Sequence, residues 1–164
     1  MPNAGACPGE GIQQSKASPG PVTDPEGLVR VVIHPLHAEA DGSLKSSAIS
    51  MDELRGGGAS VVRRNFLTHQ QMEDFCNSLI TGKASRKICG ALSAPAGELR
   101  AIKDSKGVQV FCIVDDGDPP SIPAHALILW SGASPEPPRK FRGMLVERLG
   151  RLRSIDSLYA NSAA

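Results

Sequence analysis

Aromatic side chains are scarce in this sequence, which has four Phe, one Tyr and one Trp among 164 residues. Modules that bind single-stranded nucleic acid stack the bases on exposed rings, so this scarcity disfavours that class. An excess of either charge is also missing, because 18 Lys and Arg stand against 17 Asp and Glu. Binding to a phosphate backbone usually requires a strongly basic balance, so the net charge of +1 indicates no partner.

The sequence also lacks paired cysteines and long apolar runs. Its four cysteines form no Cys-x-x-Cys pair, and three of them, Cys76, Cys89 and Cys112, lie in apolar segments. This placement is typical of reduced thiols in a core. No apolar run is long enough to cross a bilayer, and no basic start precedes an apolar stretch. We therefore expect a cytoplasmic protein that does not enter a membrane.

The residues that are present suffice for one hydrophobic core, since 40% of the chain is hydrophobic and its length favours one domain. Residues 1–26 are rich in Pro and Gly and have almost nothing apolar to bury, so we expect a disordered leader. Strand and helix patterns alternate irregularly over residues 27–153, and residues 154–164 form a tail. The prediction is a single α+β domain with a mixed sheet of about five strands and about three helices.

Local patterns place most of these elements. Apolar or β-branched runs between turn residues predict strands over residues 28–33, 59–63, 87–92, 108–114 and 124–130. Thr68 and Gln71 have the spacing of a capping box, so a helix begins there. Two further helices are expected over residues 97–103 and from about Arg139.

Three side chains near predicted strand ends are candidates for catalysis. Asp116 belongs to an acidic loop after a strong strand, where enzymes commonly hold a general base, although the same loop is typical turn chemistry. His125 begins the next strand and could act as an acid or base if Asp116 or His34 orients it. We therefore select His34, Asp116 and His125, with structural histidines as the alternative.

A metal or cofactor is not expected. His34 and His37 form an H-x-x-H pair, but a structural zinc site normally shows two such pairs, and Pro35 prevents a regular helix between them.

A serine nucleophile is not expected either. Ser60, Ser93 and Ser121 lack the Gly-x-Ser-x-Gly elbow, which argues against covalent catalysis. Arg63 is the candidate for binding a phosphate or carboxylate of a substrate.

Cationic side chains gather in the predicted last helix. They are Arg139, Lys140, Arg142, Arg148 and Arg151. Such a group forms either a solvated helix face or a surface for an acidic partner.

These patterns leave two main hypotheses for function. The first is a small interaction or accessory module that binds a protein partner through the basic helix, with nucleic acid as a weaker option. The alternative is a small hydrolase or transferase that acts on a phosphate-bearing ligand through His34, Asp116 and His125 beside Arg63.

The order of several short motifs resembles a diffuse group of short uncharacterised bacterial proteins. The motifs lie within residues 28–130 and are His34-Pro35, Asp41-Gly42, Ser46-Ser47-Ala48, Ala59-Ser60-Val61-Val62 and Pro123-Ala124-His125-Ala126. Ile49 stands where similar chains have an aromatic residue. The resemblance implies a bacterial origin, one domain, and a role for His34 and His125.

Overall fold

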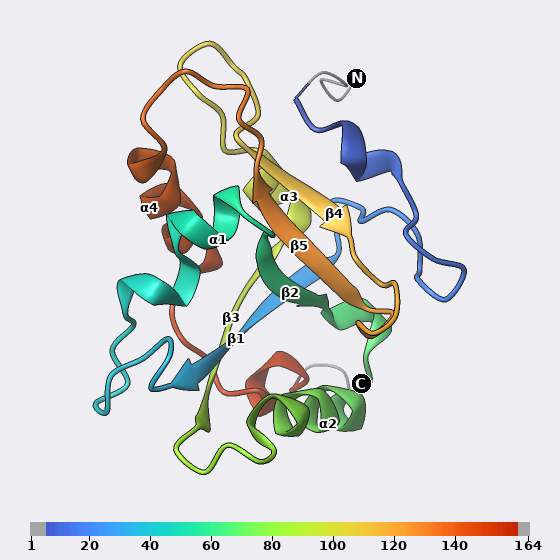
Figure 1. Ribbon diagram of the computed structural model, residues 1–164, viewed down its shortest axis with the longest axis vertical. Helices are drawn as coiled ribbons and strands as arrows, with labels where there is room; N and C mark the ends of the chain where they lie inside the picture. Colours follow the sequence, from blue (N-terminus) through green and yellow to red (C-terminus); the bar gives the residue numbers. More distant parts are fainter. Residues whose placement is uncertain (1–5, 161–164) are drawn as a thin grey trace.

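Five strands form one sheet in the structure, a computed structural model that describes residues 6–160. Their order across the sheet is β3-β1-β2-β5-β4, and all neighbours pair antiparallel (Figure 1). Their bounds are β1 Gly27–His34, β2 Ala59–Arg63, β3 Lys87–Pro95, β4 Phe111–Asp115 and β5 His125–Trp130. The predicted α+β class and the number of strands are confirmed, and each strand overlaps a predicted one. The sheet was expected to be mixed but is antiparallel throughout.

Four α-helices accompany the sheet in this part of the chain, where about three were expected. They are α1 Met51–Arg55, α2 His69–Ile80, α3 Ala96–Arg100 and α4 Pro138–Leu149, and short 3-10 turns occur at Pro8–Gly11 (η1), Ser46–Ile49 (η2), Arg64–Phe66 (η3) and Asp156–Leu158 (η4). The capping box at the start of α2 is confirmed, because the Thr68 side chain accepts from the Gln71 backbone and the Gln71 side chain from Thr68. The additional helix, α1, begins at a Ser50 cap within a segment that lacks a long apolar stripe.

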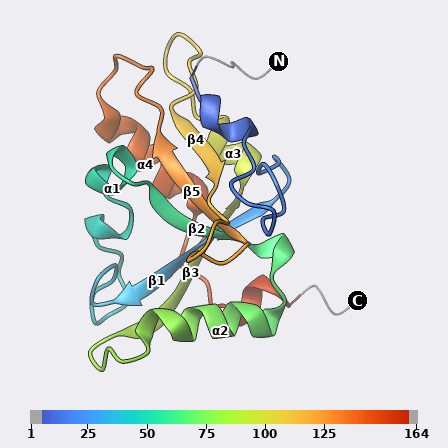
Figure 2. The ribbon, with the colours of Figure 1, turned by 45° about the vertical axis from the view of Figure 1, so that its right-hand side comes forward.

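The two faces of the sheet are covered differently. The larger core lies under α1, α3 and α4, which contribute Leu54, Leu99 and Leu145. On the opposite face α2 covers β1 and β3, as Figure 2 shows, and buries Met72 there. The β4 end of that face carries a small cluster in which Cys7 packs on β4. Between these two covers, Ser60 on β2 and His125, Leu127 and Leu129 on β5 are only half-buried.

The segment expected as a disordered leader is packed against the sheet over residues 6–26, while residues 1–5 lie outside the described residues. Glu10 accepts a hydrogen bond from the Ile113 backbone and pairs with Arg100 on α3, at 2.8 and 3.0 Å. Polar contacts of this kind, together with a disulfide, fix a segment that has little apolar area of its own. Part of the expected tail also packs, because Leu158 is buried beneath α2.

Cys7 and Cys112 form a disulfide across 105 residues of sequence, which corrects the expectation that Cys112 is a reduced core thiol. Sequence spacing gave no hint of this bond, because the two residues meet only when the N-terminal segment lies on β4. Cys76 and Cys89 are free. Burial raises the pKa of the Cys76 thiol to about 11, so Cys76 is an inert core residue, as expected.

We expect the double variant Cys7→Ser/Cys112→Ser to lose ~2–5 kcal/mol of unfolding free energy in urea titrations, because a cross-link over a long loop restricts the unfolded chain strongly. Cys89→Ser is the control, since this half-buried cysteine is free. Equal stability of the double variant and the oxidised wild type would contradict a disulfide that contributes to folding.

Candidate active site

Three neighbouring strands bring Ser60, His125 and Asp116 onto one face of the sheet. His125 lies opposite Val62, and Ser60 is two residues from Val62 along β2, which makes it a diagonal neighbour of His125. On the other side of β5, Asp116 continues the β4 register, and its backbone donates to the His125 carbonyl at 3.1 Å. Side chains alternate between faces, so all three point to the partly covered region between α2 and the N-terminal segment.

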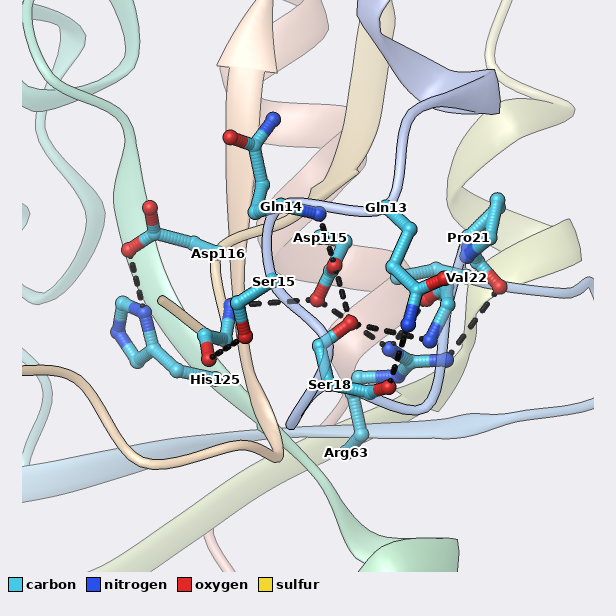
Figure 3. A network of polar contacts seen from close by, with 12 residues as sticks. Gln13, Gln14, Ser15, Ser18, Pro21, Val22, Arg63, Asp115, Asp116 and His125 are labelled. Carbon is cyan, nitrogen blue, oxygen red and sulfur yellow. Dashed lines mark hydrogen bonds and ion pairs between the residues drawn. The ribbon is translucent and has the colours of Figure 1, made fainter. Parts of the chain in front are cut away.

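The three side chains form a continuous chain of hydrogen bonds. His125 Nδ1 lies 2.7 Å from Asp116 Oδ2, an interaction drawn in Figure 3. His125 Nε2 is in hydrogen-bond contact with the Ser60 hydroxyl on its other side. A carboxylate at Nδ1 keeps the proton on that nitrogen, so Nε2 is free to accept from the serine. The side chain of His125 is 12% exposed and that of Asp116 is 36% exposed, so the chain runs from a shielded centre to the surface.

The backbone around Asp116 is held by the N-terminal segment. The Ser15 hydroxyl donates to the carbonyl of Gly117, the residue after Asp116, at 3.0 Å (Figure 3). A Cβ at Gly117 would collide with the Pro123 carbonyl oxygen, so only glycine fits at this close approach.

Arg63, the expected substrate-binding residue, is fully buried and cannot meet a substrate phosphate. Its Nε and Nη2 donate to the two carboxylate oxygens of Glu26 at 2.6 and 2.8 Å. Nη1 donates to the Gly20 carbonyl at 2.7 Å and lies 3.5 Å from Asp115 Oδ1 (Figure 3). The guanidinium therefore ties the N-terminal segment to the sheet, and the prediction of a ligand-binding role is corrected.

The structure does not bring His34 to this site. Its ring Nδ1 is 3.1 Å from the Ala38 carbonyl in the loop after β1. Val29 pairs with Val62 opposite His125, and His34 lies five residues farther along β1, so the two histidines are separated by roughly 17 Å along the strand direction alone.

The basic side chains of α4 are divided between solvent and contacts within the chain. Arg142 donates to the Ile49 carbonyl at 2.5 Å, and Arg148 donates to the Glu98 carbonyl at 3.3 Å. Lys140 pairs with Glu136 at 3.2 Å, and Arg139 is exposed. Arg151 is also exposed but lies beyond the end of α4 at Leu149. These contacts leave a smaller cationic surface than the sequence alone indicated.

A second cluster of titratable side chains joins α2 to η4. His69 Nε2 lies 2.9 Å from Asp156 and 3.6 Å from Glu73, and the ring stacks on Tyr159. Both acids are exposed. Exposed ion pairs of this kind contribute little to stability, so this cluster only connects α2 to η4 at the surface.

Sequence reasoning missed Ser60 because it required the nucleophile elbow. A triad is recognised by geometry and not by a local motif. The available signal was the strand pattern itself: if the second and fifth predicted strands pair with Val62 opposite His125, Ser60 and His125 share a face.

Comparison with protein-family models, with curated proteins and with solved structures finds no match to this chain, so the resemblance to a bacterial group stays a prediction. Within residues 6–160, no helix has the length and apolar character needed to cross a membrane.

Proposed function

We propose that this protein is a hydrolase or acyl transferase in which Ser60 is the nucleophile, His125 the general base and Asp116 the residue that orients the histidine. The hydrogen-bond chain from Asp116 through His125 to Ser60 carries this proposal. It supports the enzyme hypothesis drawn from the sequence, with His125 and Asp116 in the expected roles and Ser60 in place of His34. A phosphate-bearing substrate loses its support, because Arg63 is buried in ion pairs.

The chemistry that fits this arrangement is acyl transfer. Ser60 Oγ attacks the carbonyl carbon of an ester or thioester while His125 Nε2 takes the hydroxyl proton. The resulting imidazolium gives that proton to the leaving alcohol or thiol, and an acyl-serine remains. Water, activated by the same histidine, then releases the acid and restores the hydroxyl. Asp116 keeps its charge throughout and stabilises the imidazolium.

The direct test is covalent labelling of the intact protein with diisopropyl fluorophosphate, followed by peptide mass spectrometry. We expect one adduct, on Ser60, because fluoride leaves as the activated oxygen bonds to phosphorus. Ser60→Ala is expected to abolish both the adduct and the hydrolysis of p-nitrophenyl acetate.

Ser93→Ala is the matched control, since Ser93 is also a half-buried strand serine but has no histidine partner among its hydrogen bonds in the described residues. Its labelling and turnover are expected to equal those of the wild type. Wild-type protein that is neither labelled on Ser60 nor active on the ester in a Ser60-dependent way would refute the proposal.

Binding of a protein partner through the basic residues in and just after α4 stays a prediction. The exposed Arg139 and Arg151 would meet an acidic surface, and the double variant Arg139→Ala/Arg151→Ala is expected to lose such a partner.

A cytoplasmic location also stays a prediction, but its basis in reduced cysteines has weakened. Stable disulfides such as Cys7–Cys112 are more typical of oxidising compartments.

A further inference from the structure

A small cavity lies directly beside Ser60, between β1, β2 and α2. Its volume is about 100 Å³, and Ser60 is part of its wall. The β1–β2 pairing covers only Leu28 and Val29, opposite Arg63 and Val62, and stops before the level of Ser60. The space between the strands and α2 is therefore open next to the proposed nucleophile.

The wall of the cavity is mainly apolar. Its apolar lining residues are Val29, Val31, Ile33, Val61, Phe75 and Leu79. The Val61 side chain itself packs in the core of the opposite face. Arg30 also lines it, but its guanidinium is engaged by the Ala48 and Ser60 carbonyls and by Glu53, at 3.1, 2.9 and 2.7 Å. Ser60 and His37 are the other polar residues of the wall.

His37 adds no charge to the wall. Its Nδ1 accepts from the Ile33 backbone at 3.2 Å, which leaves the proton of the neutral ring on Nε2. Burial, followed by the nearby Arg30 charge, lowers the pKa of His37, so the neutral form dominates at pH 7. A wall made mainly of apolar groups and a neutral ring favours an uncharged ligand.

We infer that this cavity binds the acyl group of the substrate and selects short-chain esters or thioesters of about two to four acyl carbons. The size sets this limit, because an engineered apolar cavity of about 150 Å³ holds a single benzene ring, and this cavity is smaller. The inference rests on the proposed function, since the acyl chain enters the cavity only when its carbonyl carbon is at Ser60. A longer chain would leave methylene groups in water or displace α2.

The test is a chain-length series of p-nitrophenyl acetate, butyrate and octanoate with the full-length protein. We expect kcat/KM for octanoate to be at least ~10-fold below that for butyrate, since each methylene group that the pocket cannot hold costs measurable specificity. Leu79→Ala enlarges the cavity and is expected to raise the octanoate-to-acetate ratio by ~10-fold, whereas Leu79→Trp fills it and is expected to lower turnover of butyrate more than that of acetate.

Ile80→Ala is the matched control, because Ile80 is the next residue of α2, is also half-buried and does not line the cavity. It is expected to leave the chain-length profile unchanged. Ser60-dependent hydrolysis with no chain-length limit, or a profile that both Leu79 variants leave unchanged, would overturn the acyl-pocket inference while the hydrolase proposal stands. If the wild type shows neither the Ser60 adduct nor Ser60-dependent turnover, the hydrolase proposal and the acyl-pocket inference both fail.

Discussion

We expect the Asp116→Asn variant to hydrolyse p-nitrophenyl acetate ~10³–10⁴-fold more slowly than the wild type, with kcat reduced and KM little changed. The side-chain amide introduced at this position would donate to His125 Nδ1 and move the ring proton to Nε2. Nε2 could then no longer accept the Ser60 proton. The carboxylate is 36% exposed, so its replacement by an amide of equal size should leave the urea midpoint nearly unchanged.

Asp118→Asn is the control for this variant, because Asp118 belongs to the same loop and is exposed. It is expected to retain wild-type kcat. If Asp116→Asn also retains full activity while folded, Asp116 does not orient the histidine, and the hydrogen bond at 2.7 Å is structural only.

A second large effect is expected at Arg63, where removal of one partner leaves buried carboxylates without their cation. Arg63→Met should lower the free energy of unfolding by ~3–5 kcal/mol, as urea titration would measure. Arg63 is fully buried, and its partners Glu26 and Asp115 are 7% and 0% exposed. Water therefore cannot reach the remaining carboxylates to stabilise their charge.

Two further variants make this prediction specific. Arg55→Met is the control, because Arg55 is exposed, and it should change stability by less than ~0.5 kcal/mol. Adding Glu26→Gln to Arg63→Met should recover part of the loss, since it removes one of the stranded charges. A single variant Arg63→Met as stable as the wild type would contradict a structural role for the ion pairs.

The same ion pair makes the stability depend on pH. Burial alone would raise the pKa of Glu26, but hydrogen bonds from Arg63 and Thr23 outweigh it and hold the pKa below its usual value. A lowered pKa in the folded state means that this contribution is present above the unfolded pKa and is lost as pH falls through the folded pKa. We expect the acid-induced loss of stability below about pH 4.5 to be smaller in Glu26→Gln than in the wild type.

Local patterns predicted the elements well, because caps, turns and apolar spacing act over a few residues. The α2 start at Thr68 follows from side chains three residues apart. The run from Leu28 to Ile33 predicted the strand β1, and all six of these residues are buried. The short helix α1 was missed, since five residues have too little periodicity to separate a helix from a loop.

The candidate site was predictable only in part. Asp116 and His125 are nine residues apart, on either side of the loop between β4 and β5, so the sequence could offer Asp116 as a partner of His125, with His34 as the alternative. Ser60 is 65 residues from His125, and Arg63 is 37 residues from Glu26. Whether such residues meet depends on which strands become neighbours and in which register.

By itself, the sequence determined the α+β class, the approximate strands and the capped helix, because each of these depends on residues close together in the chain. Only the tertiary structure decided that Ser60 completes the hydrogen-bond chain, that Arg63 forms a buried ion pair with Glu26, and that Cys7 bonds to Cys112 across 105 residues. The physical reason is register: side chains alternate across a strand, so a shift of one residue between β2 and β5 would turn Ser60 to the opposite face and leave His125 without a serine.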